Sequence, residues 1–332
     1  MKEGCDLCYS TALALLKKGR VSVASQLLAL LVEVLVETHT PESDTWLDRL
    51  VELHEAHVTA MTTLEATAQE TTRLQRLQRD WLLRALQWSA DLGTMRFGHN
   101  RLQACMGEHC WKLANIEAHA DAATAAILEE EEVAELQCDA VQHMALAEKP
   151  EALVAWFKTL PKPTDAEIAQ GHTCPPALRD ALFTRAILLM AAVENLRDAN
   201  ALLRGYLDQV EERSADDLAT SYTSKEDGKA PSHAMFACML LRILEKDTRT
   251  GPLYSWLMRS FRRELDGLYK AQTVLGFTTK IGKIYFNIQP PPNMLNMMEN
   301  MMGMLGGGGL GGGPNPAMMQ AMMQQMQAGG MR

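Results

Sequence analysis

Glycine is distributed very unevenly along this 332-residue chain, and its scarcity over most of the length constrains the fold. The first 289 residues contain 12 glycines, about 4% against a usual frequency of about 7%, and the last 43 residues contain the other 10. After proline, glycine is the residue that a helix interior tolerates worst. A glycine-poor body of this length is therefore predicted to be helical.

The apolar residues of the body repeat every three and four positions, which is the period of one helix face. Helix breaks are expected near Gly19, Pro41, Gly93, Pro150 and Pro161. The resulting helices are short and closely connected, so successive helices should be antiparallel neighbours. Such pairs stack into an all-α, TPR-like α-solenoid, with room for roughly seven pairs. The repeating apolar positions include Leu13, Leu16, Val23, Leu27, Leu30, Leu31, Val34, Leu35, Trp81, Leu82, Ala85 and Leu86.

Three stretches depart from this helical pattern. Residues 159–176 are proline-rich and are predicted to form a loop. Residues 214–232 are polar, and the sequence Glu226-Asp227-Gly228 is typical of a tight turn, so Tyr222-Thr223 and the residues after the turn could form a small inserted β-hairpin. From the triple proline at 290–292 onward the chain is rich in methionine and glycine. We therefore divide it into a solenoid, 1–289, and a disordered low-complexity tail, 290–332.

Composition excludes several classes of protein. The formal net charge of −9 disfavours a sequence-independent nucleic-acid binder, which needs a basic surface. The seven cysteines are an odd number, and the first residues form neither a signal-peptide core nor a long apolar run. The sequence therefore predicts a cytosolic protein in a reducing compartment.

No complete catalytic or cofactor motif is present, and no cofactor is expected. His54 and His57 imitate a zinc-protease motif, but they are three residues apart where the motif needs four, so we expect two histidines on a polar helix face. Cys5 and Cys8 lack a second ligand pair and are predicted to be free. The four arginines at 73, 76, 79 and 84 form a basic helix, either a solvated face or a site for an acidic partner.

The tail carries two clusters of methionine at helical spacing. The first cluster would give a short helix an almost all-methionine stripe, which suits an apolar partner of varied shape. The alternative is that the tail is compositionally biased and has no specific function. The clusters are Met294, Met297, Met298, Met301, Met302 and Leu305, and then Met318, Met319, Met322, Met323 and Met326.

Several short motifs resemble the family of Golgi-to-ER traffic protein four, a scaffold of the GET pathway. The sequence RALQWS at 84–89, FGHNRL at 97–102 and Trp111-Lys112 are similar to one stretch of that family. The sequence IGKIYFNI at 281–288, followed by prolines, is similar to its last helix. The family usually has a helix pair before the stretch that resembles residues 8–16. We therefore expect that this chain lacks the pair or is truncated.

The resemblance implies a non-enzymatic cytosolic adaptor that helps deliver tail-anchored proteins to the ER membrane. It implies two partners, a ubiquitin-like-domain protein and a targeting ATPase. The ATPase contact is left open, because in the family it is made by N-terminal helices that this chain is expected to lack. No nucleic acid and no stable membrane insertion are expected. The residues that would hold a partner are Tyr222, Asp227, Gly228, Met235, Phe236, Ile281, Tyr285, Phe286, Met294, Met298 and Met301.

Other interpretations stay open at this point. Phe236 and Phe286 are equally well explained as solenoid core. A helical-repeat subunit of a proteasome-lid-like regulatory complex is the main alternative function, although such subunits carry a winged-helix module where this chain has its tail. A metal-dependent hydrolase would have to use His54, His57, His109 and Cys110.

Overall fold

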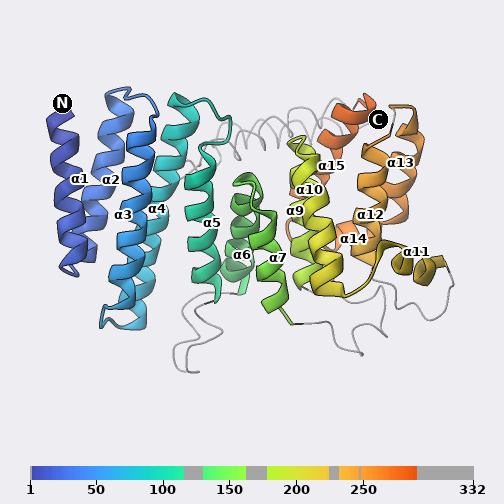
Figure 1. The fold of residues 1–332 in the computed structure, drawn as a ribbon, viewed down its shortest axis with the longest axis horizontal. Helices are drawn as coiled ribbons and strands as arrows, with labels where there is room; N and C mark the ends of the chain where they lie inside the picture. Colours follow the sequence, from blue (N-terminus) through green and yellow to red (C-terminus); the bar gives the residue numbers. More distant parts are fainter. Residues whose placement is uncertain (1, 116–129, 162–177, 224–231, 247, 290–332) are drawn as a thin grey trace, which may run out of the picture.

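The computed structural model describes residues 2–115, 130–161, 178–223, 232–246 and 248–289. Within these residues the protein contains α-helices and two short helical turns but no strand, and the helices stand side by side in a row that runs from α1 to α13 (Figure 1). The predicted all-α solenoid is therefore confirmed. The helices are α1 Lys2–Lys17, α2 Val21–Glu37, α3 Asp44–Thr62, α4 Ala68–Leu92, α5 Asn100–Asn115, α6 Glu130–Leu146, α7 Pro150–Thr159, α9 Leu178–Ala192, α10 Leu196–Tyr206, α11 Ala215–Thr223, α12 Ser232–Leu244, α13 Gly251–Ser260, α14 Arg262–Asp266 and α15 Ala271–Phe286, with a π-helix at Leu207–Glu211 and a 3₁₀ turn at Thr248–Thr250.

Four of the turns between neighbouring helices share one hydrogen-bond pattern. In each, a backbone N–H beyond the helix end donates to the carbonyl oxygen five residues earlier, and the residue before the donor has a positive φ. This is the Schellman closure, which satisfies the last carbonyl groups of a helix and reverses the chain. The predicted breaks at Gly19, Pro41 and Pro150 are thereby confirmed. The donors are Arg20, Thr40, Lys149 and Asn195, and the positive-φ residues are Gly19, His39, Glu148 and Glu194.

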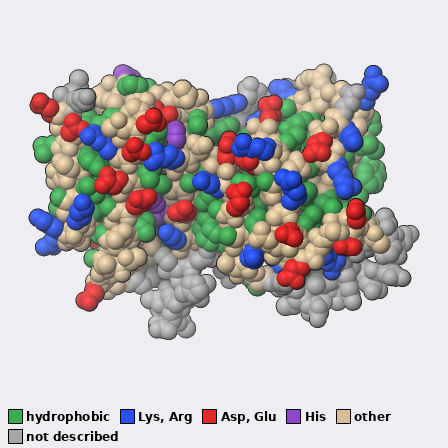
Figure 2. All heavy atoms as spheres, viewed as in Figure 1, with side chains coloured by type: hydrophobic (Ala, Val, Ile, Leu, Met, Phe, Trp, Pro, Cys, Tyr) green, Lys and Arg blue, Asp and Glu red, His purple; other side chains and the backbone are tan. Residues whose placement is uncertain are grey.

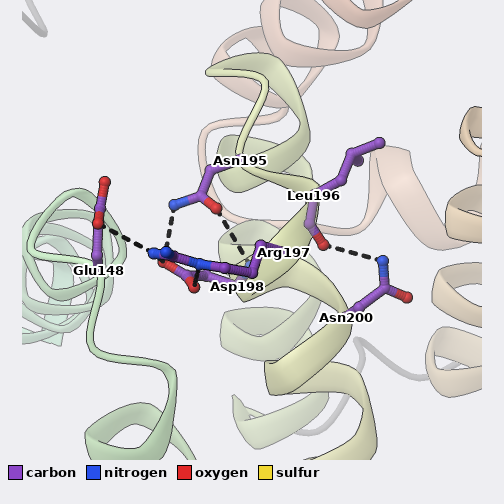
Figure 3. Close-up of polar contacts among 6 residues, drawn as sticks. All are labelled: Glu148, Asn195, Leu196, Arg197, Asp198 and Asn200. Carbon is purple, nitrogen blue, oxygen red and sulfur yellow. Dashed lines mark hydrogen bonds and ion pairs between the residues drawn. The ribbon is translucent and has the colours of Figure 1, made fainter.

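The surface of the row carries charges of both signs among hydrophobic side chains (Figure 2). Many charges pair across neighbouring helices. The turn between α9 and α10 shows how (Figure 3): the Asn195 side chain accepts from the backbone N–H of Asp198 at 3.1 Å, and the Arg197 guanidinium bonds both Asp198, at 2.8 Å, and Glu148, at 3.2 Å. Glu148 belongs to the turn between α6 and α7, so Arg197 links the start of α10 to that turn.

Helix α9 is the most enclosed element of the C-terminal part. Its residues from Leu182 to Ala192 are all buried, because α6, α10, α12 and α15 surround it. Phe183 of α9 stacks on Tyr206 of α10 with ring centroids 3.8 Å apart, and Phe157 of α7 packs edge-on against both rings. The last helix thus returns to the middle of the chain instead of extending the row.

The structure corrects the expectation of a β-hairpin near residue 222. Tyr222 and Thr223 form the end of α11 and are not a strand. The predicted turn at Asp227 and Gly228 lies outside the described residues, as do most of the expected loop at 159–176 and the whole tail from residue 290. None of the helices in the described part of the chain is long and apolar enough to cross a membrane.

Candidate partner-binding end of the solenoid

The predicted partner residues that the structure describes gather in the C-terminal part, but most are buried. Met235 and Phe236 lie on α12 with exposed fractions of 6% and 1%, and Phe236 packs against Phe261 with centroids 5.5 Å apart. Ile281 of α15 is fully buried. This packing supports the core interpretation of Phe236, and contact of these side chains with a partner stays a prediction.

The end of α15 is fixed by aromatic and hydrogen-bond contacts to its neighbours. Phe286 is buried against Tyr254 of α13, with centroids 4.9 Å apart, so it too has a core role in this chain. The Tyr254 hydroxyl donates to the carbonyl oxygen of Thr278 at 2.5 Å. Tyr285 is half-buried, and its hydroxyl donates to the carbonyl oxygen of Ala191 at 3.3 Å. Burial, with a smaller effect of the Glu194 carboxylate, raises the pKa of Tyr285 to about 12.

Tyr285 is therefore the predicted aromatic residue of α15 that offers the most surface to a partner. The side chain of Tyr222 is not among those described, although its backbone is helical. Asp227, Gly228, Met294, Met298 and Met301 lie outside the described residues. Their partner contacts stay predictions.

Sequence reasoning missed the exposed apolar side chains of α13. Leu253 is 54% exposed and Trp256 is 50% exposed, although the residues that follow each of them in α13, Tyr254 and Leu257, are buried. Near the start of α15, Leu275 is 40% exposed. The sequence does carry a signal for this exposure. The short segment 251–258 has apolar residues all round the helix, and one packed face cannot bury them all.

The opposite end of the row also exposes apolar side chains. Leu7 of α1, Val23 of α2 and Leu30 of α2 are exposed by 66%, 55% and 48%. In Figure 1 these helices stand at the far end from α13. The solenoid therefore has two separate apolar ends.

The histidines that imitate a metal motif have a different environment from the one predicted. The expectation of a polar face is wrong, because His54 and His57 are 4% and 0% exposed and lie in the core where α3 meets α4 and α5. Gln78 Nε2 donates to His54 Nδ1 at 3.1 Å, and His109 Nε2 donates to the Gln75 carbonyl oxygen at 2.9 Å. Neither ring nitrogen of His57 has a hydrogen-bond partner.

Burial is the main cause of the low pKa values of these histidines. It lowers the pKa of His54 and of His57 to about 4, and that of His109 to about 3, with smaller contributions from neighbouring positive charges. In the part of the chain that the structure describes, no group of three or more His, Cys, Asp or Glu side chains is arranged to hold a metal ion. The hydrolase interpretation thus gains no support from this cluster. Cys5 is buried and Cys8 is half-buried, and neither forms a disulfide bond.

The basic helix is used within the chain. Arg76 of α4 pairs with Glu132 at 3.0 Å, and Arg79 of α4 pairs with Asp139 at 2.7 Å, both on α6. Arg73 lies 3.5 Å from Glu70, and Arg84 lies 4.0 Å from Glu33. The acidic surface that faces this helix is thus supplied by the chain's own neighbouring helices.

Comparison with known proteins decides between the scaffold hypotheses. Residues 1–305 match the family model described as Golgi to ER traffic protein 4. The chain belongs to this GET4 family. It is 22% identical over 320 residues to Protein GET4 of Arabidopsis thaliana, covering 92% of this chain and 85% of the relative. A crystal structure of C. therm. Get4 aligns with 94% of this chain and 90% of its own, with 18% identity and a TM-score of 0.37.

Membership in the GET4 family confirms the resemblance identified from the motifs near residues 84–112 and 281–288. The match makes the chain an α-solenoid component of the GET system, and it favours this function over a proteasome-lid-like subunit.

Proposed function

We propose that this GET4-family protein is a non-enzymatic cytosolic adaptor in the post-translational delivery of tail-anchored proteins to the ER membrane. The observation that carries the proposal is the family match over residues 1–305, which extends from the first helix into the predicted methionine stripe. A solenoid suits an adaptor because its length provides separate surfaces for separate partners. The two apolar ends, at α1–α2 and at α13–α15, are such surfaces.

A ubiquitin-like-domain protein is proposed to bind the C-terminal end, near Tyr285 and the segment between α11 and α12 that contains Asp227 and Gly228. Tyr285 is the candidate anchor because a half-buried aromatic side chain with a fixed orientation can add contact area at low entropic cost. A targeting ATPase is the second proposed partner, and the exposed Leu7 and Val23 at the other end are its candidate contacts. Met294, Met298 and Met301 are proposed to contact apolar segments of clients.

The test compares two tyrosine variants of the full chain. Tyr285→Ser should weaken binding of the ubiquitin-like partner at least ten-fold, as expected for loss of an aromatic anchor. Tyr9→Ser is the matched control, because Tyr9 is also a half-buried tyrosine with a bonded hydroxyl but lies on α1. A double replacement of Tyr285 and Phe286 is a poorer test, since Phe286 packs on Tyr254 and its loss would destabilise the end of the solenoid.

Circular dichroism establishes that both variants are folded, and isothermal titration calorimetry measures their affinity. If folded Tyr285→Ser binds as tightly as the unmodified chain, the proposed surface on α15 is wrong. If the unmodified chain binds neither the ubiquitin-like protein nor the ATPase of the pathway, the adaptor function itself is wrong.

A further inference from the structure

The exposed side chains of α13 form an apolar surface at the end of the solenoid. Leu253 and Trp256, one turn apart, are about half exposed, and Arg259 extends the same face by a further turn. Of the six tryptophans, Trp256 is the one that is exposed, since the others are buried or half-buried. In Figure 1 α13 stands at the end of the row, and in Figure 2 hydrophobic side chains reach that edge of the molecule.

The terminal layer of a solenoid normally presents a polar outer face, because no further repeat covers it. A tryptophan and a leucine at this position break that rule. The surface thus needs a cover, and the end of the chain is well placed to supply one.

The chain leaves α15 beside α13. The Ile288 N–H donates to the Gly282 carbonyl oxygen at 3.0 Å, and the turn places Ile288 over Gly282. Gly282 itself touches the Tyr254 ring: a Cβ there would lie 3.2 Å from it. Phe286 contacts the same ring. The last described residues therefore lie against the helix that carries Leu253 and Trp256.

The first methionine cluster begins within reach of this face. Met294 follows Gln289 by five residues, which span up to about 17 Å when extended. Helix α13 has 10 residues and is thus about 15 Å long. Prolines 290–292 favour an extended conformation over this short distance. The apolar face at α1 and α2, at the other end of the row, is far less accessible to this cluster.

The chemistry of the cluster matches the face. Methionine side chains adapt to irregular apolar surfaces and make favourable sulfur contacts with aromatic rings such as that of Trp256. Residues 290–332 contain a single acid, Glu299, within this cluster. Arg259 and Arg263 are exposed at the C-terminal end of α13 and on α14, where they would attract that carboxylate.

We propose that residues 293–305 dock on Leu253, Trp256 and Arg259 of the same chain and cover the C-terminal end of the solenoid in the free protein. The covered face belongs to the α13–α15 end that is proposed above as a partner surface, so a partner that binds α13 must displace the tail. Docking also means that any client or partner that uses the methionine stripe must first displace it from α13.

Oxidative footprinting of Trp256 in the full chain tests the contact. Serine at positions 294, 297, 298 and 301 should increase hydroxyl-radical oxidation of Trp256 at least three-fold, with the half-buried Trp156 as the internal reference. Serine at 318, 319, 322 and 323 is the matched control, because it removes the same number of methionines from the second cluster. Equal oxidation of Trp256 in the two variants would overturn the proposal.

A photocrosslinker in place of Met298 identifies the docking site and the chain that provides it. The expected product is a monomer crosslinked to the α13 peptide, in a yield independent of protein concentration. A crosslinked dimer would assign the face to a second copy, and a crosslink to α1 or α2 would assign the tail to the other end; either result overturns docking in cis on α13. Arg259→Glu should lower the yield, and Glu299→Arg in addition should restore it.

Discussion

The buried histidines should make the N-terminal half of the solenoid sensitive to acid. His57 is the sharpest case, since it is fully buried and both ring nitrogens lack a hydrogen-bond partner. Its pKa in the folded protein is about 4, against 6.5 for an exposed histidine. The folded state therefore favours the neutral ring, and its stabilising effect is complete above about pH 6.5 and is lost as the pH falls towards 4.

The size of the effect follows from the two pKa values. At pH 5 an unfolded histidine is almost fully protonated, whereas folded His57 is mostly neutral. Protonation of the unfolded state then lowers the free energy of unfolding by about 2 kcal/mol relative to pH 7. Replacing His57 with leucine, which is of similar size and has no polar atom, should remove this contribution while keeping the core filled.

Urea unfolding at pH 7 and pH 5, followed by circular dichroism, measures the difference. The loss of unfolding free energy on going to pH 5 should be about 2 kcal/mol smaller in His57→Leu than in the unmodified chain. His39→Asn is the control, because His39 is an exposed residue in a left-handed turn that asparagine also adopts. An unchanged pH dependence in His57→Leu would refute the reasoning, whatever the stability of the variant at pH 7.

Three further predictions concern the packing of the C-terminal part. Glu194 has a φ of +65°, so Glu194→Gly should raise the free energy of unfolding by about 1 kcal/mol in urea titrations. Asn195→Ala removes the side chain that caps α10 through Asp198 and should cost about 1 kcal/mol, seen as faster amide exchange in the first turn of α10. The Arg179 guanidinium lies 2.6 Å from the buried carboxylate of Glu211, so Arg179→Met removes this ion pair and should lower the free energy of unfolding by about 3 kcal/mol. No change in thermal unfolding would show that the ion pair is unimportant.

The fold was predictable because its boundaries are marked by local residues. Gly19 adopts a positive φ, and Pro150 occupies the first turn of α7, so each acts through its own backbone. The burial of His54 and His57 was also visible in principle, since they continue the apolar spacing of Leu50 and Leu53 on α3. The polar face predicted for His54 and His57 was wrong because histidine is polar, whereas its position in the apolar repeat decides its burial.

The partner-binding surface was less predictable, because exposure depends on which helices happen to be neighbours. Phe286 and Trp256 are both aromatic residues on helices near the C-terminus, yet one packs on Tyr254 and the other is half exposed. Apolar residues all round the segment 251–258 indicate that some of its side chains must be exposed, but they do not indicate which ones. The helix at Tyr222 was missed for a different reason: the nearby Asp-Gly pair suggested a hairpin, although the residues before it continue the helix that begins at Ala215.

The enclosure of α9 has a consequence for synthesis on the ribosome. Tyr285 bonds Ala191 across 94 residues of sequence, so the site that α15 fills stays open long after α9 has emerged. At about 5–20 residues per second, the delay is roughly 5–20 seconds. Helices α1 to α4 pack mainly on one another and can complete most of their contacts earlier. During that interval the N-terminal helices are packed, but the apolar helix α9 still lacks its contact with α15. Chaperones are most needed in this period.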